Sequence, residues 1–329
     1  MAVPAQAEPL PVPRRRLVGL RRAFAPVAEA RGMTRTMLWL GAAITAGFIL
    51  LALLAPVIAP YEFDQFRSPE EGRFAQLEAP SRDHLMGTNV QSTDVLSRVI
   101  WGTQTELKVV LISLFVSLSI GVPLGLLAGY FGGKLDRVLV LIMDALLVFP
   151  FLLLAIVIAF LLADRVGQGI LSAAIAITVV YIPLYFRVVR NHTISIREEP
   201  FVEAARAMGA KPFTIIRKYV FFNVVQNVPP LATLNAADAI LTLAALGFLG
   251  YGIQPTDGAE WGYDIQRAVS DAASGIWWTG LFPGLAIVLL VTGLTLLGEG
   301  LNETINPVLR KRPVAKVDLQ ATSLGMEQQ

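Results

Sequence analysis

The sequence contains no cysteine and few charged residues. The absence of Cys among its 329 residues excludes disulfides, thiolate metal sites and a cysteine nucleophile. Only 16% of the residues are charged and 54% are hydrophobic, with a mean hydropathy of +0.60. Soluble domains carry about a quarter charged residues. Much of the surface must therefore face something other than water.

Histidine and the common phosphate-binding and hydrolytic motifs are also scarce. His84 and His192 are the only histidines and lie far apart, so we expect no His-based metal site. No G-x-x-x-x-G-K-[ST] segment occurs; the nearest candidate, the glycines before Lys134, fails because Leu135 follows the lysine. The hydrolase motifs G-x-S-x-G and H-E-x-x-H are also absent. We therefore predict no enzyme activity, no cofactor and no ATP hydrolysis by this chain alone. The net charge of +2 is too small to indicate nucleic acid.

Six long apolar runs predict an all-α membrane protein with six transmembrane helices. At about 1.5 Å per residue, such runs cross the roughly 30 Å hydrocarbon layer. The first run ends at Pro56 and Pro60 without a small-residue cleavage site, which favours an uncleaved span over a signal peptide. The predicted spans are residues 37–59, 107–131, 138–163, 170–186, 224–250 and 280–298.

Flanking regions of different composition frame this membrane domain, which we place at residues 37–312. Residues 1–36 are basic and rich in Pro and Ala, so we predict a disordered tail there. Residues 313–329 are predicted to form a second, polar tail.

The charges of the connecting segments predict the orientation. Lys and Arg gather in both tails, in the 132–137 turn and in the 187–218 loop, whereas 61–106 and 255–278 are acidic. By the positive-inside rule, both termini and the 187–218 loop are cytoplasmic. We therefore expect a multi-pass protein of the cell (inner) membrane.

The second predicted span carries four glycines at intervals of four residues. This spacing lines one helix face and lets another backbone approach closely, which is how helices pack in lipid. Pro123 lies among them and can bend the helix. A moving or pore-lining helix remains open, but static packing is favoured. The glycines are Gly121, Gly125, Gly129 and Gly133.

Two acids, Asp144 and Asp238, lie inside predicted spans. A charged side chain near the bilayer centre costs roughly 2.5 kcal/mol or more, so it normally faces protein or water. For Asp144 we favour a structural partner, Arg187 or Lys134. For Asp238, a water-facing and a packed position both remain open.

A polar stretch, EEPFVEAARAMG, separates the fourth and fifth spans. Pro200 near its start and Gly209 at its end are typical of helix limits, which predicts a short helix at about 198–212. Glu203 and Arg206 are three residues apart and can pair. Docking into a groove of another protein and lying on the membrane surface both fit this helix. Its predicted small, apolar side consists of Phe201, Ala204, Ala205 and Met208.

This stretch resembles the E-A-A-x3-G motif of the permease subunits of binding-protein-dependent ABC importers. In that family the motif forms a cytoplasmic coupling helix in a cleft of the ATPase subunit. The resemblance implies the type I permease fold of ABC importers. Phe222 departs from it, because the family usually has a proline there, which affects how the next span begins. The residues to which the resemblance assigns ATPase coupling are Glu203, Ala204, Ala205, Arg206 and Gly209.

The segment from His84 to Gly102 resembles HPLGTDxxGRDVLSRxxxG of the dipeptide, oligopeptide and nickel subgroup of these permeases. The departures are Asn89, Ser92 and Thr93. An ordered loop with a capped helix start fits this segment at least as well as direct substrate contact.

The end of the fifth span resembles LSFLGLGxQPP of the same subgroup. Gly247 replaces the serine, and Leu243 replaces a glutamate that usually precedes it by four residues. Whether Asp238 takes the place of that glutamate is open. The segment Glu260-Trp261-Gly262 matches the subgroup's E-W-G.

The resemblance implies three kinds of protein partner: a second, related permease subunit, two ATP-binding subunits and an extracytoplasmic solute-binding protein. The expected cargo is di- or oligopeptides, with nickel or an oligosaccharide as alternatives. A stand-alone secondary transporter or channel is the rival class, and an assembly subunit without transport is a third. Secondary transporters often contain inverted repeats, and no repeat between the two halves of this sequence is evident.

Overall fold

The computed structural model describes residues 32–69, 72–167 and 169–305. Most of the predicted N-terminal tail therefore lies outside the described residues, but residues 32–36 belong to the first helix. The predicted tail at 313–329 and the last part of the predicted membrane domain, 306–312, lie outside them as well.

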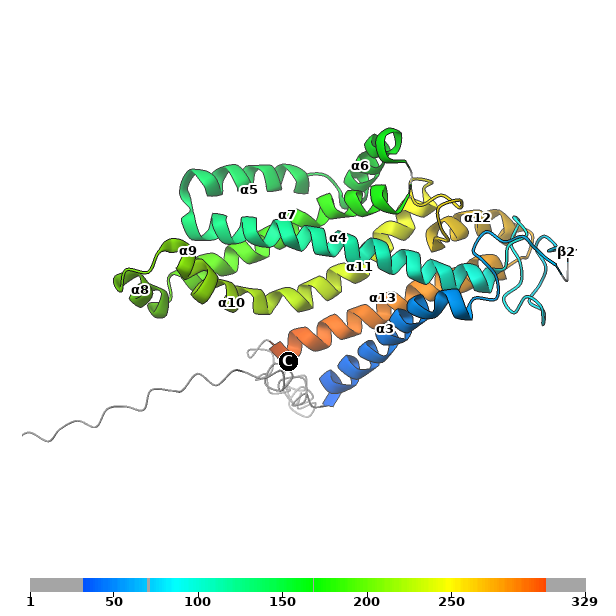
Figure 1. Cartoon of the computed structure of the whole chain (residues 1–329), viewed down its shortest axis with the longest axis horizontal. Helices are drawn as coiled ribbons and strands as arrows, with labels where there is room; N and C mark the ends of the chain where they lie inside the picture. The colour runs from blue at the N-terminus through cyan, green and yellow to red at the C-terminus, as the bar shows by residue number, and fades with distance from the viewer. Residues whose placement is uncertain (1–31, 70–71, 168, 306–329) are drawn as a thin grey trace, which may run out of the picture.

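Long helices run along the longest axis of the molecule (Figure 1). The longer ones are α3 (Gly32–Ile58), α4 (Val95–Phe131), α5 (Gly133–Leu147), α6 (Phe151–Val166), α7 (Ile170–Arg197), α11 (Val228–Phe248), α12 (Trp261–Ala273) and α13 (Trp278–Ile305). Between α7 and α11 lie α8 (Pro200–Ala207), α9 (Pro212–Ile215), the π-helical η1 (Ile216–Val220), α10 (Phe221–Val224) and the 3-10 turn η2 (Val225–Asn227). Two short antiparallel strands, β1 (Arg67–Ser68) and β2 (Gly72–Arg73), pair Arg67 with Arg73.

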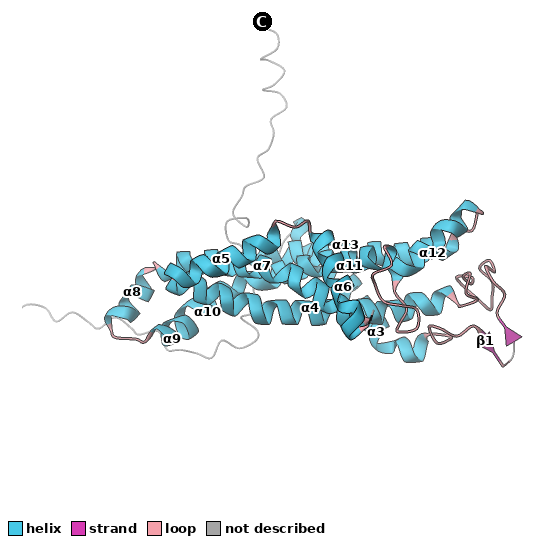
Figure 2. Cartoon of the chain, turned by 90° about the horizontal axis from the view of Figure 1, so that it is seen from above, coloured by secondary structure: helices cyan, strands magenta, loops and turns pink. Residues whose placement is uncertain are grey.

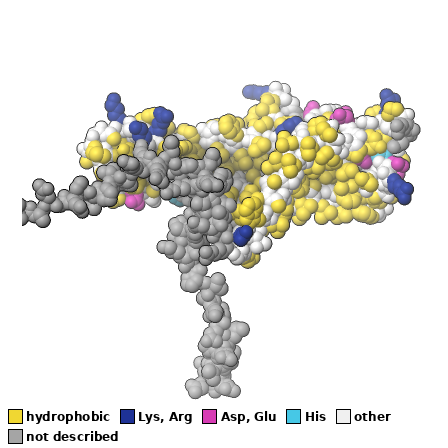
Figure 3. Space-filling model, turned by 60° about the horizontal axis from the view of Figure 1, so that its bottom comes forward, with side chains coloured by type: hydrophobic (Ala, Val, Ile, Leu, Met, Phe, Trp, Pro, Cys, Tyr) yellow, Lys and Arg dark blue, Asp and Glu magenta, His cyan; other side chains and the backbone are white. Residues whose placement is uncertain are grey.

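The predicted all-α membrane fold is confirmed. Five helices in the described ranges are long and apolar enough to cross a membrane, and α5 with α6 can count as a sixth, bent span. Figure 3 shows hydrophobic side chains over much of the middle of the visible face. Figures 1 and 2 both place α8 and α9 at one end and the strands at the other.

The third predicted span, 138–163, is not one straight helix. The axes of α5 and α6 meet at 93° across a break between Leu147 and Phe151. Pro150 lies in this break: it cannot donate to the preceding turn, and it disfavours helical geometry at Phe149. Hydropathy averages across such a break, so the bend was not predicted.

The second span begins earlier than predicted, at Val95 rather than at residue 107. The first 12 residues of α4 include Arg98 and Glu106, which lower the mean hydropathy there, but both side chains are buried. The helix therefore extends beyond its apolar part. α7 likewise continues past residue 186 to Arg197.

The glycine face of α4 packs against α7. A Cβ added to Gly121, Gly125 or Gly129 would lie 2.9, 2.8 or 2.7 Å from a backbone oxygen of α7. The two backbones therefore approach too closely for any other residue without a shift. Gly133 was assigned to this face wrongly: a Cβ there would meet nothing within 4 Å, and its φ of +64° places it in the turn that begins α5.

α3 and α13 also pack through glycines. A Cβ on Gly300 of α13 would lie 2.9 Å from the Leu38 Cα of α3, and one on Gly293 would lie 2.6 Å from the Ile44 side chain. Thr34 donates a hydrogen bond to Glu303 near the ends of the two helices. The first and last described helices are thus held side by side.

Candidate functional site

The short helix α8 lies where the sequence predicts it. Pro200 is its first residue, a position that suits the fixed φ and missing N–H of proline. Just beyond its end, Gly209 has a φ of +81°, a conformation that other residues adopt at a cost. The helix therefore ends by residue 208, within the predicted range of 198–212.

Two side chains anchor α8 to the rest of the chain. Val202 and Ala205 are fully or almost fully buried, in an apolar cluster that includes Val189 of α7, Ile215 and Val220. The helix is thus fixed to both the preceding span and the following one.

The other side of α8 faces away from the chain. Phe201 is 41% and Met208 79% exposed, and Ala204 is exposed between them. The prediction that Ala205 belongs to this side is wrong, because Ala205 lies three residues after Val202 and turns inward with it.

The charged side chains of the EEPFVEAARAMG stretch on α8 do not pack against the rest of the chain. Glu203 and Arg206 are both exposed, and no ion pair joins them in the described structure. The pairing that their spacing allows is therefore not formed.

Arginines of α7 contact α4 and α5 near the same end of the molecule. The Arg190 guanidinium lies 2.5 and 2.6 Å from the two carboxylate oxygens of Asp136. Arg197, the last residue of α7, donates to the Gly129 carbonyl at 2.8 Å. Because α8 begins three residues after Arg197, these contacts connect α8 to α4 and α5.

Asp144 has a partner. Its carboxylate lies 2.6 Å from Nη2 of Arg187, which is one of the two partners predicted for it. Both side chains are about half exposed, so the pair lies on the surface of the chain.

The chain between α8 and α11 changes helix type repeatedly. Pro229 and Pro230 cannot donate to the carbonyls of Val225 and Gln226, and the Val228 N–H bonds the Val225 carbonyl in a 3-10 turn instead. The chain from Pro212 to Phe248 nevertheless stays helical and forms one candidate span, so the hydrogen bonding changes at η1 and η2 without a break at Phe222.

Asp238 and Leu243 lie in different surroundings. Leu243 is fully buried in the main apolar core, so an apolar side chain suits that position. Asp238 is exposed on another side of α11. Asp238 therefore does not occupy the position of the family glutamate.

At the opposite end of the molecule, Asp94 caps α4. Its Oδ2 accepts hydrogen bonds from the Ser97 N–H and hydroxyl, both at 2.7 Å, and its Oδ1 lies 2.9 Å from Nδ1 of His84. The capped helix start expected for this segment is confirmed.

An ion pair joins α4 to α12. Arg98 contacts Asp264 with Nε–Oδ1 and Nη2–Oδ1 distances of 2.8 and 2.7 Å, and it also donates to the Phe63 carbonyl. Burial raises the pKa of Asp264, and the neighbouring guanidinium opposes that shift. The pair fixes the outer loop, α4 and α12 to one another.

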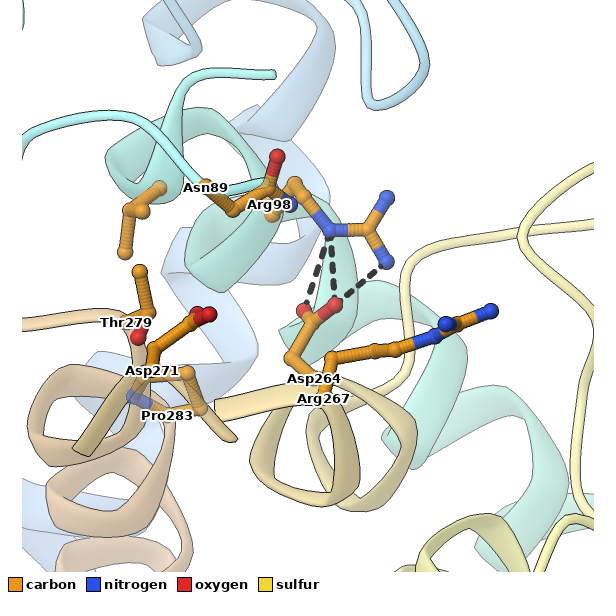
Figure 4. A pocket seen from close by; sticks show the side chains of 8 residues that line it. Asn89, Arg98, Asp264, Arg267, Asp271, Thr279 and Pro283 are labelled. Atoms are coloured by element: carbon orange, nitrogen blue, oxygen red, sulfur yellow. Dashed lines mark hydrogen bonds and ion pairs between the residues drawn. The ribbon is translucent and has the colours of Figure 1, made fainter. Parts of the chain in front are cut away.

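A small polar cavity lies beside this ion pair. Figure 4 shows Asp264 facing Arg98 and, on the other side, Asp271 near Thr279. The buried Asp271 Oδ2 and Thr279 Oγ1 lack hydrogen-bond partners within the described chain. The cavity, of about 10 Å³, has room for about one water molecule, which suits these two oxygens.

Two buried carboxyl groups meet where α4, α11 and α12 join. Glu260 caps α12: Oε1 accepts from the Gly262 N–H and Oε2 from the Tyr263 N–H, both at 2.7 Å. Burial is the main cause that raises the pKa of Glu260 to about 8. Glu106 of α4 is fully buried beside Glu260, and its carboxyl oxygens have no hydrogen-bond partner in the described chain, so two negative charges side by side are disfavoured here.

Gly247 of α11 lies against this pair. A Cβ on Gly247 would overlap the Glu260 carboxyl group, so the serine of the family pattern cannot fit in this arrangement. Sequence reasoning missed Glu106, and its only signal there was an acid at the outer edge of an apolar run. In the ranges described, no group of three or more His, Cys, Asp or Glu side chains could hold a metal ion.

Comparison with known proteins places the chain among transport permeases. Residues 121–311, more than half of the chain, match the family model "Binding-protein-dependent transport system inner membrane component". The dipeptide transport system permease protein DppC of Alkalihalophilus pseudofirmus is 37% identical over 273 residues, covering 82% of this chain and 85% of the relative. The glutathione transport system permease protein GsiD of Pectobacterium atrosepticum is 33% identical over 273 residues, 82% of this chain and 87% of the relative.

Two further comparisons agree. The di/tripeptide transport system permease protein DppC of Pseudomonas aeruginosa is 36% identical over 263 residues, covering 80% of this chain and 85% of the relative. Among solved structures, inward-facing MetNI, a methionine ABC transporter, matches with a TM-score of 0.53 and 24% identity, covering 64% of this chain and 96% of the other. At that identity the structural match supports the fold alone. Together with the membrane helices and the anchored α8, these matches show that the chain belongs to the inner membrane components of binding-protein-dependent transport systems and is a permease of an ABC importer.

Proposed function

We propose that this permease forms half of a translocation pathway for di- or oligopeptides and that α8 couples it to ATP-binding subunits. A second permease subunit supplies the other half, and an extracytoplasmic solute-binding protein delivers the cargo. The mechanism is alternating access: closure of the ATPase pair displaces α8, which turns the spans and opens the pathway to the outside.

The observation on which the coupling role rests is that α8 is buried on one side and exposed on the other. Val202 and Ala205 fix the helix to the spans, while Phe201 and Met208 remain exposed on its other side. Exposed apolar side chains on a rigidly anchored helix are suited to a groove of a partner protein. This end of the chain is also basic, which supports a cytoplasmic position for α8.

The contacts of α7 give the displacement a path into the spans. A shift of α8 moves Arg197, and with it the hydrogen bond to the Gly129 carbonyl. Arg190 and Asp136 then connect α7 to α5. The close packing of the α4 glycines makes α4 and α7 move as one body.

The names of the relatives support a peptide cargo. Dipeptides, di- and tripeptides and glutathione are all short peptides, and the relatives that carry those names match about four fifths of this chain. Nickel and oligosaccharides are the alternative cargoes of the subgroup.

The coupling role is tested with α8 variants in vesicles that contain the complete complex. Glu203→Ala and Gly209→Ala should reduce ATP-driven peptide uptake while ATP hydrolysis continues. Glu199→Ala is the matched control, since Glu199 is an exposed acid of the same loop whose side chain makes no capping bond. Its uptake should equal that of the wild type.

Two results would contradict the proposal. One is unchanged uptake and assembly in both α8 variants. The other is peptide transport by the purified chain without ATP-binding subunits, which would favour the stand-alone transporter.

A further inference from the structure

Asp238 presents a carboxylate inside a candidate membrane span, halfway along α11. It lies 10 residues after Val228 and 10 before Phe248, about 15 Å from either end of α11. Its side chain is exposed on the surface of the chain. An exposed acid at this depth must face lipid, another protein or water.

Lipid is the least favourable of these surroundings. A carboxylate facing lipid near the bilayer centre is costly, and acids in spans normally face protein or a water-filled cavity. The exposed surfaces of α3 and α13 show what a lipid-facing side looks like, since they carry residues such as Leu53 and Val288. The exposed side of α11 differs from them at Asp238, which is followed one turn later by the half-buried Thr242, although the neighbouring Leu241 is apolar and exposed.

No described residue balances the charge of Asp238. Asp144, the other acid within the predicted spans, is paired with Arg187 at 2.6 Å. No cation of the described residues lies within ion-pair distance of Asp238. The Thr242 hydroxyl donates to the Asp238 backbone carbonyl at 2.9 Å and therefore not to the Asp238 carboxylate.

The side chains near Asp238 on its buried side are polar but uncharged. Tyr181 of α7 is buried beside Asp238 and Thr242, and Asn235 is buried one turn before Asp238 on α11. These side chains form a polar strip that extends from the core to the exposed side of α11. Such a strip suits contact with water and with a hydrated solute.

We propose that Asp238 lines the water-filled pathway and binds the cationic ammonium group of the passing cargo. This inference rests on the proposed function, because it requires a pathway along α11 and a cargo with a free amino group. A carboxylate makes a charge-assisted hydrogen bond to an ammonium group, which is stronger than a hydrogen bond between neutral groups. Asp238 would thus select for peptides with an unblocked amino terminus.

Accessibility of single cysteines tests the location, and the absence of native cysteine makes the chain suited to it. The variants are Asp238→Cys, Val288→Cys as the lipid-facing control and Ala239→Cys as the buried control, each in a complete complex whose other subunits lack reactive cysteines. We expect a charged, membrane-impermeant thiol reagent to label Cys only at position 238. Labelling there by a lipophilic reagent alone, or no labelling, would overturn the proposal.

Cargo protection tests the ligand. With Thr242→Cys as the reporter, alanyl-alanine should slow labelling by about tenfold or more during turnover, and N-acetyl-alanyl-alanine should not. Adding Asp238→Asn should abolish this difference, and adding Asp238→Glu should keep it. Equal protection by both peptides, or protection that survives Asp238→Asn, would overturn the assignment.

The labelling readout separates this inference from the coupling role of α8. If the α8 variants stay coupled while position 238 is labelled and protected, only the proposed coupling fails. If the α8 variants uncouple while position 238 is inaccessible, only the present inference fails.

Discussion

Arg98 and Asp264 form an ion pair at 2.7 Å in which their side chains are only 3% and 9% exposed. The two residues are 166 positions apart, on α4 and α12. Removal of one partner would leave the other charge buried without compensation, which typically costs about 3–5 kcal/mol.

Arg98→Ala should therefore lower the stability of the chain by about 3–5 kcal/mol. The measurement is the thermal unfolding midpoint of the purified protein in detergent. Arg187→Ala is the control, because its pair with Asp144 is half exposed and should be worth no more than about 1 kcal/mol. Equal midpoints for the two variants would contradict a special role of the buried pair.

The carboxyl pair of Glu106 and Glu260 should make stability depend on pH. The pKa of Glu260 is about 8 in the fold against 4.5 as its ordinary value, so the folded state holds more protons between these pH values. Stability should then fall as pH rises from about 5 to 8 and should be highest on the acidic side of that window.

Glu106→Gln is the informative variant for this effect. The amide carries no charge at any pH, so the fall in unfolding midpoint between pH 5 and 8 should be smaller than in the wild type. Asp64→Asn, in an exposed outer loop, serves as the control and should keep the wild-type slope. An unaltered slope in Glu106→Gln would show that this carboxyl pair does not cause the pH dependence.

Gly125→Ala should loosen the packing of α4 on α7. Its Cβ would lie 2.8 Å from the Phe186 carbonyl oxygen, and overpacking of this kind costs about 1–3 kcal/mol. Gly47→Ala in α3 is the matched control, since a Cβ there meets nothing within 4 Å. Unfolding midpoints of the two variants give the comparison, and a Gly125 variant as stable as the Gly47 variant would disprove the close approach.

Pro229→Ala combined with Pro230→Ala should make the hydrogen bonding at the start of α11 regular. The new N–H groups can bond the carbonyls of Val225 and Gln226, so a regular helix should replace the 3-10 turn. We expect a more stable protein with slower uptake, because the segment would bend less readily. Uptake at the wild-type rate in a stabilised variant would show that bending there is not needed.

Long apolar runs were sufficient to predict the membrane helices, because their length follows from the thickness of the membrane. The orientation inferred from the charges stays a prediction. Local chemistry was sufficient for the ends of α8, since Pro200 and Gly209 act on their own backbone. Contacts between distant parts of the chain were not predictable in this way. The start of α4 has a local signal in its cap, Asp94, but the burial of Arg98 against Asp264 depends on a residue far away in the sequence.

The wrong or missing predictions at individual residues also arose because local spacing does not report tertiary contacts or helix ends. Ala205 was placed on the exposed side of α8 because its spacing fits both sides, and only the position of Val202 against α7 decides between them. Gly133 continued the regular glycine spacing of α4, but the helix ends before it. Glu106 was missed because its neighbour, Glu260, lies at the start of α12, far away in the sequence and in a polar outer segment.

The pairing of α3 with α13 has a consequence for biogenesis. α3 is the first of the described helices to leave the ribosome, and α13 is the last. Until α13 has been synthesised, the face of α3 around Leu38 and Ile44 has no glycine surface to lie against. A chain that stops before α13 would therefore leave this face of α3 without its packing partner.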